Sequence, residues 1–263
     1  VTPFQILTLQ NIIASFSLWT FILIFQPNVL SIDKNKLKSL LIQGIFGNLA
    51  SSLLFFISLQ YLSASIGIVL LFTYPALVNI LATFFYKEKI GSYRLLSLFF
   101  TFLGTILTIN LFGQSWGTIS ILGIFYGLAS ALATAFLNLY GQKILYKIKP
   151  LTVTVYPMTF STIILCLLKP PVYIFTGELD WQVWILAFTL ATASTILPLF
   201  TLLKGISIIG ASKASILSTS ELPFTIALAY LLLGDKMELG QLVGVLLIII
   251  SILLLHREEK TTQ

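Results

Sequence analysis

Charged side chains are scarce in this sequence. Aspartate, glutamate, lysine and arginine make up 9% of its 263 residues and apolar residues 57%, whereas a soluble domain carries about 25% charged residues. A soluble fold of this length has too little interior to hide so much apolar surface. The composition therefore predicts an all-α polytopic membrane protein, because a helix satisfies its own backbone hydrogen bonds in lipid.

Cysteine and histidine occur once each, as Cys166 and His256. A single cysteine excludes an internal disulfide framework and a cysteine-based metal cluster. The P-loop pattern GxxxxGKS, the zinc pattern HExxH and the nucleophile pattern GxSxG are also missing. We therefore expect no metal, no cofactor and no enzymatic activity. The alternative of an intramembrane lipid-modifying enzyme lacks a nucleophile–base pair.

Apolar runs dominate what is present. Nine of them are long enough, or nearly so, to cross a hydrocarbon core of about 30 Å, which takes about 17–25 residues. The connections between them are short and leave no room for a second, soluble domain. The nine predicted transmembrane spans are 5–25, 39–59, 65–85, 95–112, 117–141, 151–168, 182–203, 214–233 and 239–255.

The basic residues predict the orientation of these spans. All but two of the 15 lysines and arginines lie in alternate connections and in the carboxyl tail; the exceptions are Lys169 and Lys236. Basic loops face the cytoplasm, so we expect a multi-pass protein of the plasma membrane with a cytoplasmic C-terminus. The formal charge of +6 follows from this topology, and we expect no nucleic-acid partner.

Glu221 is the only acidic residue in the apolar run 214–233, and it lies two positions before Pro223. A carboxylate at the centre of a membrane helix costs about 2.5 kcal/mol or more. A helix keeps such a group where it faces a partner or a water-filled cavity. Glu221 is therefore our candidate for binding a cationic group or carrying a coupling proton. The alternative is a structural hydrogen-bond anchor between helices.

Prolines and polar residues inside the spans complete the candidate site. Pro75, Pro198 and Pro223 are predicted helix breaks, and irregular backbone at this depth is tolerated against protein or a cavity; the alternative is a simple packing kink. Polar side chains in membrane helices also hold neighbouring helices together, which is the alternative for each single residue below. The remaining candidates for substrate binding or coupling are Asn48, Tyr74, Asn79, Asn138, Ser194, Ser218 and Thr219.

Small residues recur at a spacing of four. Gly123, Gly127, Ala131 and Ala135 follow one another in this way on the run 117–141, and the pair at 240 and 244 does so on the last run. This spacing lets two helices approach closely. We interpret both stripes as packing surfaces within the chain. A homodimer formed through the last span is the alternative.

Two segments of the sequence are alike at an offset of 147 residues. Residues 62–65 align with 209–212, and 88–89 align with 235–236. Pro75 falls against Leu222, one residue short of Pro223, which predicts a slip of one residue at that point. In both copies an apolar helix follows a stretch of small residues and ends in an acidic residue followed by lysine.

The repeat divides the chain into residues 1–112, with four spans, and 113–263, with five. Five spans per copy is an odd number, so the second copy inserts upside down, which is the inverted-repeat plan of secondary transporters. The chain also begins with Val1 rather than methionine. We therefore expect that one amino-terminal span is missing from this sequence; the alternative is a genuine nine-span protein.

With these motifs the sequence resembles the EamA-type permeases of the drug/metabolite transporter superfamily. The family usually ends the repeated helix with Gly-Glu, and here the equivalents are Gly234-Asp235 and Lys87-Glu88, which is a mild departure. The resemblance implies an inverted-repeat bundle of ten helices, here lacking the first, and a transporter that often exports amino acids or related metabolites. The motifs that carry it are 62–65, 74–75, 86–89, 210–212, 221–223, 233–236 and Gly244.

The favoured function is therefore a secondary transporter that works by alternating access. A small polar metabolite would bind near the midplane between the two halves, with the lipid bilayer as surroundings and protons as the candidate coupling ion. A structural membrane subunit is the other alternative, and it would need no polar cavity.

Overall fold

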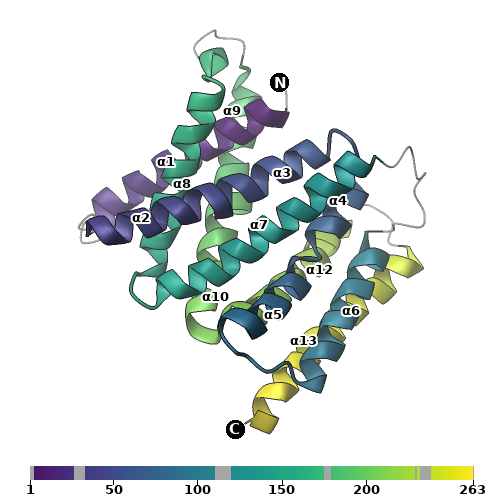
Figure 1. Cartoon of the computed structure of the whole chain (residues 1–263). Helices are drawn as coiled ribbons and strands as arrows, with labels where there is room; N and C mark the ends of the chain where they lie inside the picture. Colours follow the sequence, from purple (N-terminus) through teal and green to yellow (C-terminus); the bar gives the residue numbers. More distant parts are fainter. Residues whose placement is uncertain are drawn as a thin grey trace. The chain divides into compact units, whose positions relative to one another are not determined.

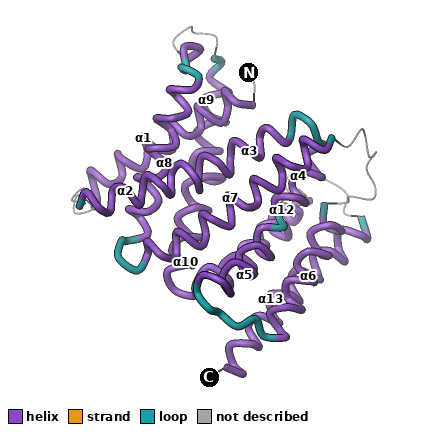
Figure 2. The backbone as a smooth tube through the Cα atoms, in the orientation of Figure 1, coloured by secondary structure: helices purple, strands orange, loops and turns teal. Residues whose placement is uncertain are grey.

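The structure is a computed structural model that describes residues 3–26, 33–109, 120–174, 179–228, 230–231 and 238–262. Within these ranges every regular element is a helix (Figure 2). The sequence-based prediction of an all-α protein is confirmed.

The first part of the chain forms seven helical segments and the long helix that follows them (Figure 1). The segment η2 is a π-helix that continues α2 and leads directly into α3. The segments are α1 (Pro3–Phe25), α2 (Lys34–Ile42), η2 (Gln43–Leu49), α3 (Ala50–Ser58), α4 (Ala64–Leu71), α5 (Tyr74–Phe85), α6 (Ser92–Thr108) and α7 (Ile121–Leu145).

The second part repeats this pattern. Its π-helix, η5, joins two α-helices in the same way, and a turn of 3-10 helix, η6, lies between α11 and α12. The segments are α8 (Pro150–Leu168), η4 (Val172–Ile174), α9 (Trp181–Thr189), η5 (Leu190–Ile196), α10 (Leu197–Ile209), α11 (Ala211–Leu217), η6 (Ser218–Ser220), α12 (Glu221–Leu228) and α13 (Leu239–Thr262).

Each predicted span contains a described helix. Among the described residues, seven helical stretches are long and apolar enough to cross a membrane, and α6 is a shorter apolar helix. The predicted span 182–203 extends further, to Ile209, and stops at Gly210, whose φ of 82° lies in the left-handed region that favours glycine. Residues 110–112, 117–119, 229 and 232–233, which the predicted spans include, lie outside the described residues.

The offset of 147 residues recurs in the helix boundaries. In every pair of equivalent elements the second begins 147 residues after the first; α5 and α12, for example, begin at Tyr74 and Glu221. The one-residue slip expected near Pro75 is therefore absent from the helix starts: the proline has shifted within the repeat, and the helix has not. The pairs are α1 and α8, α2 and α9, η2 and η5, α3 and α10, α4 and α11, α5 and α12, and α6 and α13.

The chain forms two compact units. The first consists of residues 1–52 and 136–208, and the second of residues 53–135 and 209–263. Each unit therefore contains equivalent elements from both copies of the repeat. The compact units differ from the sequence halves 1–112 and 113–263, because each copy contributes its helices to both units.

In the first unit, α1 packs against its equivalent α8. Ser15 Oγ lies 2.8 Å from Thr162 Oγ1, and these two residues are themselves 147 positions apart. Trp19 Nε1 donates to Thr159 Oγ1 at 2.8 Å. Contacts that advance along α1 while they retreat along α8 make the two helices antiparallel. An apolar cluster beside them fills the interior with Ala14, Leu18, Ile22, Val155, Met158 and Ala191.

In the second unit, α6 packs against its equivalent α13. Ser97 Oγ donates to the Ser251 carbonyl at 2.7 Å, and Gly104 lies against the carbonyl of Gly244. These two contacts exchange with one another when each residue is replaced by its equivalent 147 positions away. The helices are again antiparallel, as copies that insert in opposite directions require.

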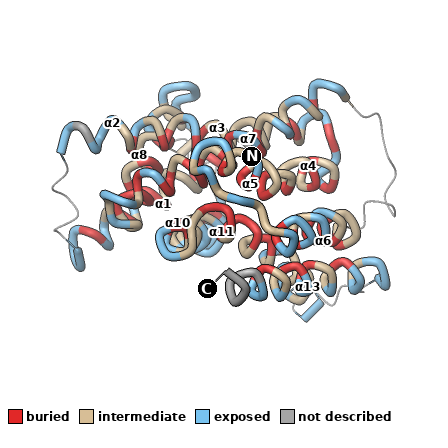
Figure 3. Tube along the Cα trace, turned by 60° about the horizontal axis from the view of Figure 1, so that its bottom comes forward, coloured by how far each residue is buried: buried red, intermediate tan, exposed pale blue. Residues whose placement is uncertain are grey.

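Burial alternates around the helices (Figure 3). Within each unit, the faces in contact carry the buried residues, while many large apolar side chains remain exposed, among them Phe16, Phe84 and Leu167. Water would make this arrangement unfavourable, because each exposed apolar side chain forgoes roughly 1.5–3 kcal/mol of burial. In lipid the same surface carries no such cost, so the exposed apolar faces are those expected of membrane-spanning helices.

Candidate substrate site

Two interrupted helices of the second unit carry most of the candidate residues. The first interruption separates α4 from α5 at residues 72–73, and Pro75 is in the first turn of α5. The second is the 3-10 segment η6, which ends where α12 begins, and Pro223 is the third residue of α12. A proline in a first turn costs the helix little, since its missing N–H has no partner there. Both prolines therefore follow an interruption and help to start the next helix.

Tyr74 connects the two interruptions. Its side chain is buried, its hydroxyl forms a hydrogen bond with Ser218 Oγ, and the same hydroxyl lies 3.4 Å from the Ser215 carbonyl. The first residue of α5 is thereby tied to the last turn of α11 and the start of η6. The geometry places a phenol and a serine hydroxyl together at the point where both helices lose their regular backbone.

Serines recur at every third position of the helical segments α11 and η6, which lead to Glu221. Ser215 Oγ donates to the Ser212 carbonyl, and Ser218 Oγ donates to the Ser215 carbonyl, each at 2.8 Å. Residues three apart are neighbours on a helix surface, so Ser212, Ser215, Ser218 and Glu221 form a polar stripe that winds around the helix from the buried Ser212 to the exposed Glu221. Thr219 is fully buried outside it, and its hydroxyl donates to the Ile216 carbonyl.

Asn79 joins α5 to α11 at the other end of this stripe. It is almost fully buried, and its Nδ2 donates to the Pro75 carbonyl at 2.8 Å and to the Ser212 carbonyl at 3.2 Å. Asn79 Oδ1 and Ser212 Oγ are buried without a hydrogen-bond partner among the described residues. The donated bonds are those of a residue that holds two helices together, which is the packing role weighed for it above.

The Glu221 side chain is exposed at the first residue of α12. The ion pair found among the described residues lies elsewhere, between Arg94 and Glu88 at 3.0 Å. A helix anchor would instead direct its carboxylate into a contact with a neighbouring helix. The exposed position is the one from which a carboxylate could meet a solute or an ion.

The other predicted site residues belong to the first unit. Asn48 is half-buried in η2, Ser194 is exposed in η5, and Asn138 is fully buried in α7. Pro198 is the second residue of α10, directly after η5. The described contacts group Tyr74, Asn79 and Ser218 in one place, and they do not include these four residues in that group.

Two glutamines that the sequence analysis passed over make contacts between helices in the first unit. Gln10 of α1 donates through Nε2 to Thr195 Oγ1 and, at 3.5 Å, to the Leu190 carbonyl. Gln43 of η2 is nearly fully buried, and its Nε2 donates to the Leu137 carbonyl at 2.9 Å. Amide side chains inside apolar spans were the available signal, and the same reasoning that selected the asparagines would have selected both.

The stripes of small residues pack within the chain. A Cβ atom added to Gly123 or Gly127 would lie against Leu62 or Leu70. Gly244 lies against Gly104, whereas Gly240 has open space around it. The packing interpretation agrees with these contacts. Because α6 lies against Gly244, a second copy of the chain could not pack on this glycine.

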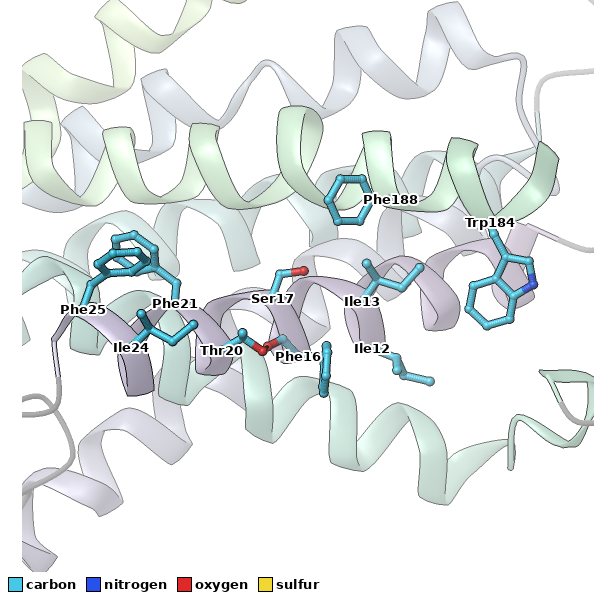
Figure 4. Close-up of a pocket in the computed structure, with 10 residues that line it drawn as sticks. All are labelled: Ile12, Ile13, Phe16, Ser17, Thr20, Phe21, Ile24, Phe25, Trp184 and Phe188. Atoms are coloured by element: carbon cyan, nitrogen blue, oxygen red, sulfur yellow. Dashed lines mark hydrogen bonds between the residues drawn. The ribbon is translucent and has the colours of Figure 1, made fainter. Parts of the chain in front are cut away.

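A hollow of about 610 Å³ lies between α1 and α9 in the first unit (Figure 4). Its walls are apolar except for Ser17 and Thr20, so it offers little to a polar solute. No predicted site residue lines it. The lining residues are Ile12, Ile13, Phe16, Ser17, Thr20, Phe21, Ile24, Phe25, Trp184 and Phe188.

The helices and their internal repeat define a polytopic membrane protein with an inverted-repeat bundle. The sequence profile of the EamA-like transporter family matches residues 1–110 and 121–257. The chain belongs to this family, as the resemblance of its motifs implies.

Curated relatives of the chain are named as transporters. An uncharacterized inner membrane transporter of Salmonella typhimurium, YicL, is 29% identical over 97% of this chain and 86% of the relative. An uncharacterized transporter of Synechocystis, sll1319, is 32% identical over 78% of this chain and 63% of the relative. Together with the family, these relatives identify the chain as a membrane transporter.

A solved crystal structure has the same fold. It matches 98% of this chain and 90% of its own chain with a TM-score of 0.81 and 15% sequence identity. At this identity the similarity concerns the arrangement of helices alone.

Proposed function

We propose that this transporter moves a small polar metabolite, an amino acid or a related compound, out of the cell by alternating access. It lies in the plasma membrane with its C-terminus in the cytoplasm. The distribution of the basic residues supports this orientation, and the inner-membrane name of the Salmonella relative supports the plasma membrane as its location. The sequence halves 1–112 and 113–263 act as the two inverted copies.

The observation that carries the proposal is the pair of equivalent positions Tyr74 and Glu221. Each begins a helix directly after an interruption, and Tyr74 is bonded to Ser218, one turn before Glu221. Transporters of inverted-repeat design bind their substrates and coupling ions at such discontinuous helices. Tyr74 and Ser218 supply hydrogen bonds to the solute, and Asn79 fixes the two helices that carry them.

Glu221 supplies the charge. An exposed carboxylate inside a membrane span is costly unless water or a positive group accompanies it. In the proposed mechanism it pairs with the amino group of the solute, or it carries the proton that couples transport to the ion gradient. In the first unit, Asn48, Asn138 and Ser194 stay candidates for contact with the solute, and Pro198 stays a candidate helix break.

The experiment has two stages. Metabolites released by cells that overproduce the protein are compared with those released by cells that lack it, which identifies the exported compound. That compound is then measured in vesicles containing the wild type, Glu221→Gln or Glu238→Gln. Glu238 is an exposed acid just before α13 and serves as the matched control.

We expect Glu221→Gln to abolish most of the transport, or its dependence on the proton gradient, while Glu238→Gln retains both. The same transport and the same pH dependence in Glu221→Gln would refute the assigned role. Equal release of all metabolites by the two cell lines would refute export itself.

A further inference from the structure

The two π-helical segments of the first unit occupy equivalent positions in the two copies. Both η2 and η5 contain seven residues, and their first residues are 147 positions apart. Long π-helices are rare in proteins, and short ones occur frequently at functional sites. A π-helix closes its hydrogen bonds between residues five apart, whereas an α-helix closes them between residues four apart, so a π segment can return to the α form by shifting its register by one residue.

The first segment is held by close backbone packing. A Cβ atom on Gly44 would lie 2.6 Å from the Pro157 carbonyl oxygen of α8. Ser161 Oγ lies 2.8 Å from both the Gly44 carbonyl and the Pro157 carbonyl. Because backbone meets backbone here, a change of register in η2 would drive the segment into α8.

The second segment is held by side-chain contacts: Ala191 packs into the apolar cluster beside α1 and α8, and one flexible side chain, that of Gln10, bonds to two of its residues. Gln10 Nε2 donates to Thr195 Oγ1 and to the Leu190 carbonyl, the latter at 3.5 Å. Thr195 Oγ1 donates to the same carbonyl at 3.2 Å. The three groups form a closed triangle around the carbonyl with which η5 begins. Rotation of the Gln10 side chain would open the triangle without moving any backbone of α1.

The surroundings of α9 offer little resistance to movement. In the span Trp181–Ile209, 11% of the residues in an apolar stretch of 18 are buried, compared with 28% in the equivalent span Lys36–Ser58. Ala187 is the one buried residue of α9. The hollow between α1 and α9 gives the side chains of Trp184 and Phe188 room on that side (Figure 4). Segments with few buried contacts are those that open most readily.

We propose that η5 is a register switch, that Gln10 is the latch that holds it in the π form, and that η2 is its fixed counterpart. When the latch opens, η5 takes the α form, and α9 turns by about 100° and shifts by about 1.5 Å. This role rests on the proposed function, since the turn of α9 is then one of the movements of alternating access. The test of the switch itself needs no substrate.

The switch is measured as a distance within the first unit. Spin labels are placed on two exposed residues, Leu186 of α9 and Tyr146 after α7, in a full-length chain carrying Cys166→Ala and embedded in lipid nanodiscs. Electron–electron resonance then gives the distribution of distances. Gln10→Met keeps the length of the side chain and removes its N–H donors. Ser161→Ala is the matched control, because it removes the side-chain hydrogen bond that a neighbouring helix donates to η2.

We expect Gln10→Met to produce a second population of distances, separated from the first by several ångströms. Ser161→Ala should leave the wild-type distribution unchanged. An unchanged distribution in Gln10→Met would overturn the latch, and an equal change in Ser161→Ala would overturn the asymmetry between the two segments.

Thr195→Val provides a second test that keeps the shape of η5. It removes the hydroxyl from the triangle and should shift the distribution in the same direction as Gln10→Met; if Gln10→Met does not fold, an unchanged distribution here refutes the latch. Because the readout is a distance, failure of the latch is distinguishable from failure of the proposed export, which the metabolite comparison tests separately.

Discussion

At the scale of single residues, hydroxyl and amide groups hold the interrupted helices of the second unit together. Tyr74, Asn79 and Ser218 each bridge or border the contact between α5 and α11. Such a group can contribute both to helix packing and to solute binding, and an experiment must distinguish these two contributions. Stability and affinity measured on the same variant provide that separation.

Tyr74→Phe should weaken solute binding and leave the fold intact. The variant removes the hydrogen bond to Ser218, and Ser218 keeps its bond to the Ser215 carbonyl. One hydrogen bond contributes about 0.5–1.5 kcal/mol, so the KM for the exported compound should rise roughly two- to tenfold. Transport kinetics in vesicles give this value. Tyr146→Phe, outside the site, should leave the KM unchanged, and an unaltered KM in Tyr74→Phe would leave Tyr74 with a packing role alone.

Glycines four residues apart on α13 make a second prediction at this scale. A Cβ on Gly244 would lie 2.7 Å from the Gly104 carbonyl oxygen, whereas a Cβ on Gly240 would meet nothing within 4 Å. Gly244→Ala should therefore lower the free energy of unfolding by about 1–3 kcal/mol through overpacking. Gly240→Ala should be neutral or slightly stabilising, because alanine favours a helix.

The temperature at which the detergent-solubilised protein loses its monodisperse chromatographic peak compares the two glycine variants. Equal melting temperatures for Gly244→Ala and Gly240→Ala would contradict the close approach of α6 and α13. A lower temperature for Gly240→Ala alone would indicate that the last span meets another partner through that position.

At the scale of elements, hydropathy placed a helix in every predicted span, and seven of the described helical stretches are long and apolar enough to match the thickness of the bilayer. The sequence also revealed the offset of 147 residues. It suggested a slip near Pro75 because proline was used as the reference point, and the helix start at Tyr74 shows that the offset is maintained. Proline is tolerated at several positions of a first turn, so it marks a helix start less precisely than the apolar pattern does.

The π-helical segments could not be predicted in this way. Their local sequences, such as 43–49, mix apolar, small and polar residues, as other parts of the spans do. What distinguishes them is a partner from a distant helix: Ser161 for the Gly44 carbonyl and Gln10 for the Leu190 carbonyl. Such a partner is known only once α1 and α8 have been packed. The exposure of Glu221 was likewise open, since sequence alone allowed both an anchor and a binding role.

The antiparallel pairing of equivalent helices is testable by disulfide formation. Ser97 Oγ and Ser251 Oγ lie 2.9 Å apart, and Ser15 Oγ and Thr162 Oγ1 lie 2.8 Å apart. Cysteines at either pair, in a chain carrying Cys166→Ala, should oxidise to a disulfide, because side-chain oxygens this close leave only a short approach for two sulfur atoms to bond. Labelling of the denatured protein with maleimide-PEG counts the thiols that remain.

The control pair for this experiment is Ser97→Cys with Leu246→Cys. Leu246 is an exposed residue on the same helix as Ser251. Both of its thiols should remain reactive, while the thiols of the two matched pairs disappear after oxidation. Two free thiols in both matched pairs would rule out the antiparallel packing of α6 on α13 and of α1 on α8.

At the scale of the whole molecule, the helix starts repeat between the two copies, whereas the charges differ, and these two features have different consequences. The helix starts repeat without insertion or deletion, so equivalent helices begin at equivalent residues in both copies. The charges repeat only in part: Lys89 is matched by Lys236, but Lys87 is matched by Gly234, and the cluster at 34–38 is matched by 181–185, which contains no lysine. The repeated backbone supplies two inverted copies, and the unequal charges give the pair one orientation in the membrane.

The proposed orientation can be checked from the carboxyl end, where the count of spans does not depend on where the sequence begins. Green fluorescent protein matures in the cytoplasm and stays dark when exported unfolded across a bacterial inner membrane. Fusions after Gln263 and after Lys149 should therefore fluoresce, and a fusion after Asp180, between α8 and α9, should not. Periplasmic alkaline phosphatase at the same three positions should give the opposite pattern. Because α9–α10, α11–α12 and α13 follow Asp180, an odd number of crossings separates that position from the tail. Fluorescence after both Asp180 and Gln263 would mean that one of these three stretches does not cross the membrane. The second copy would then lack a span, and the inverted-repeat topology would be refuted.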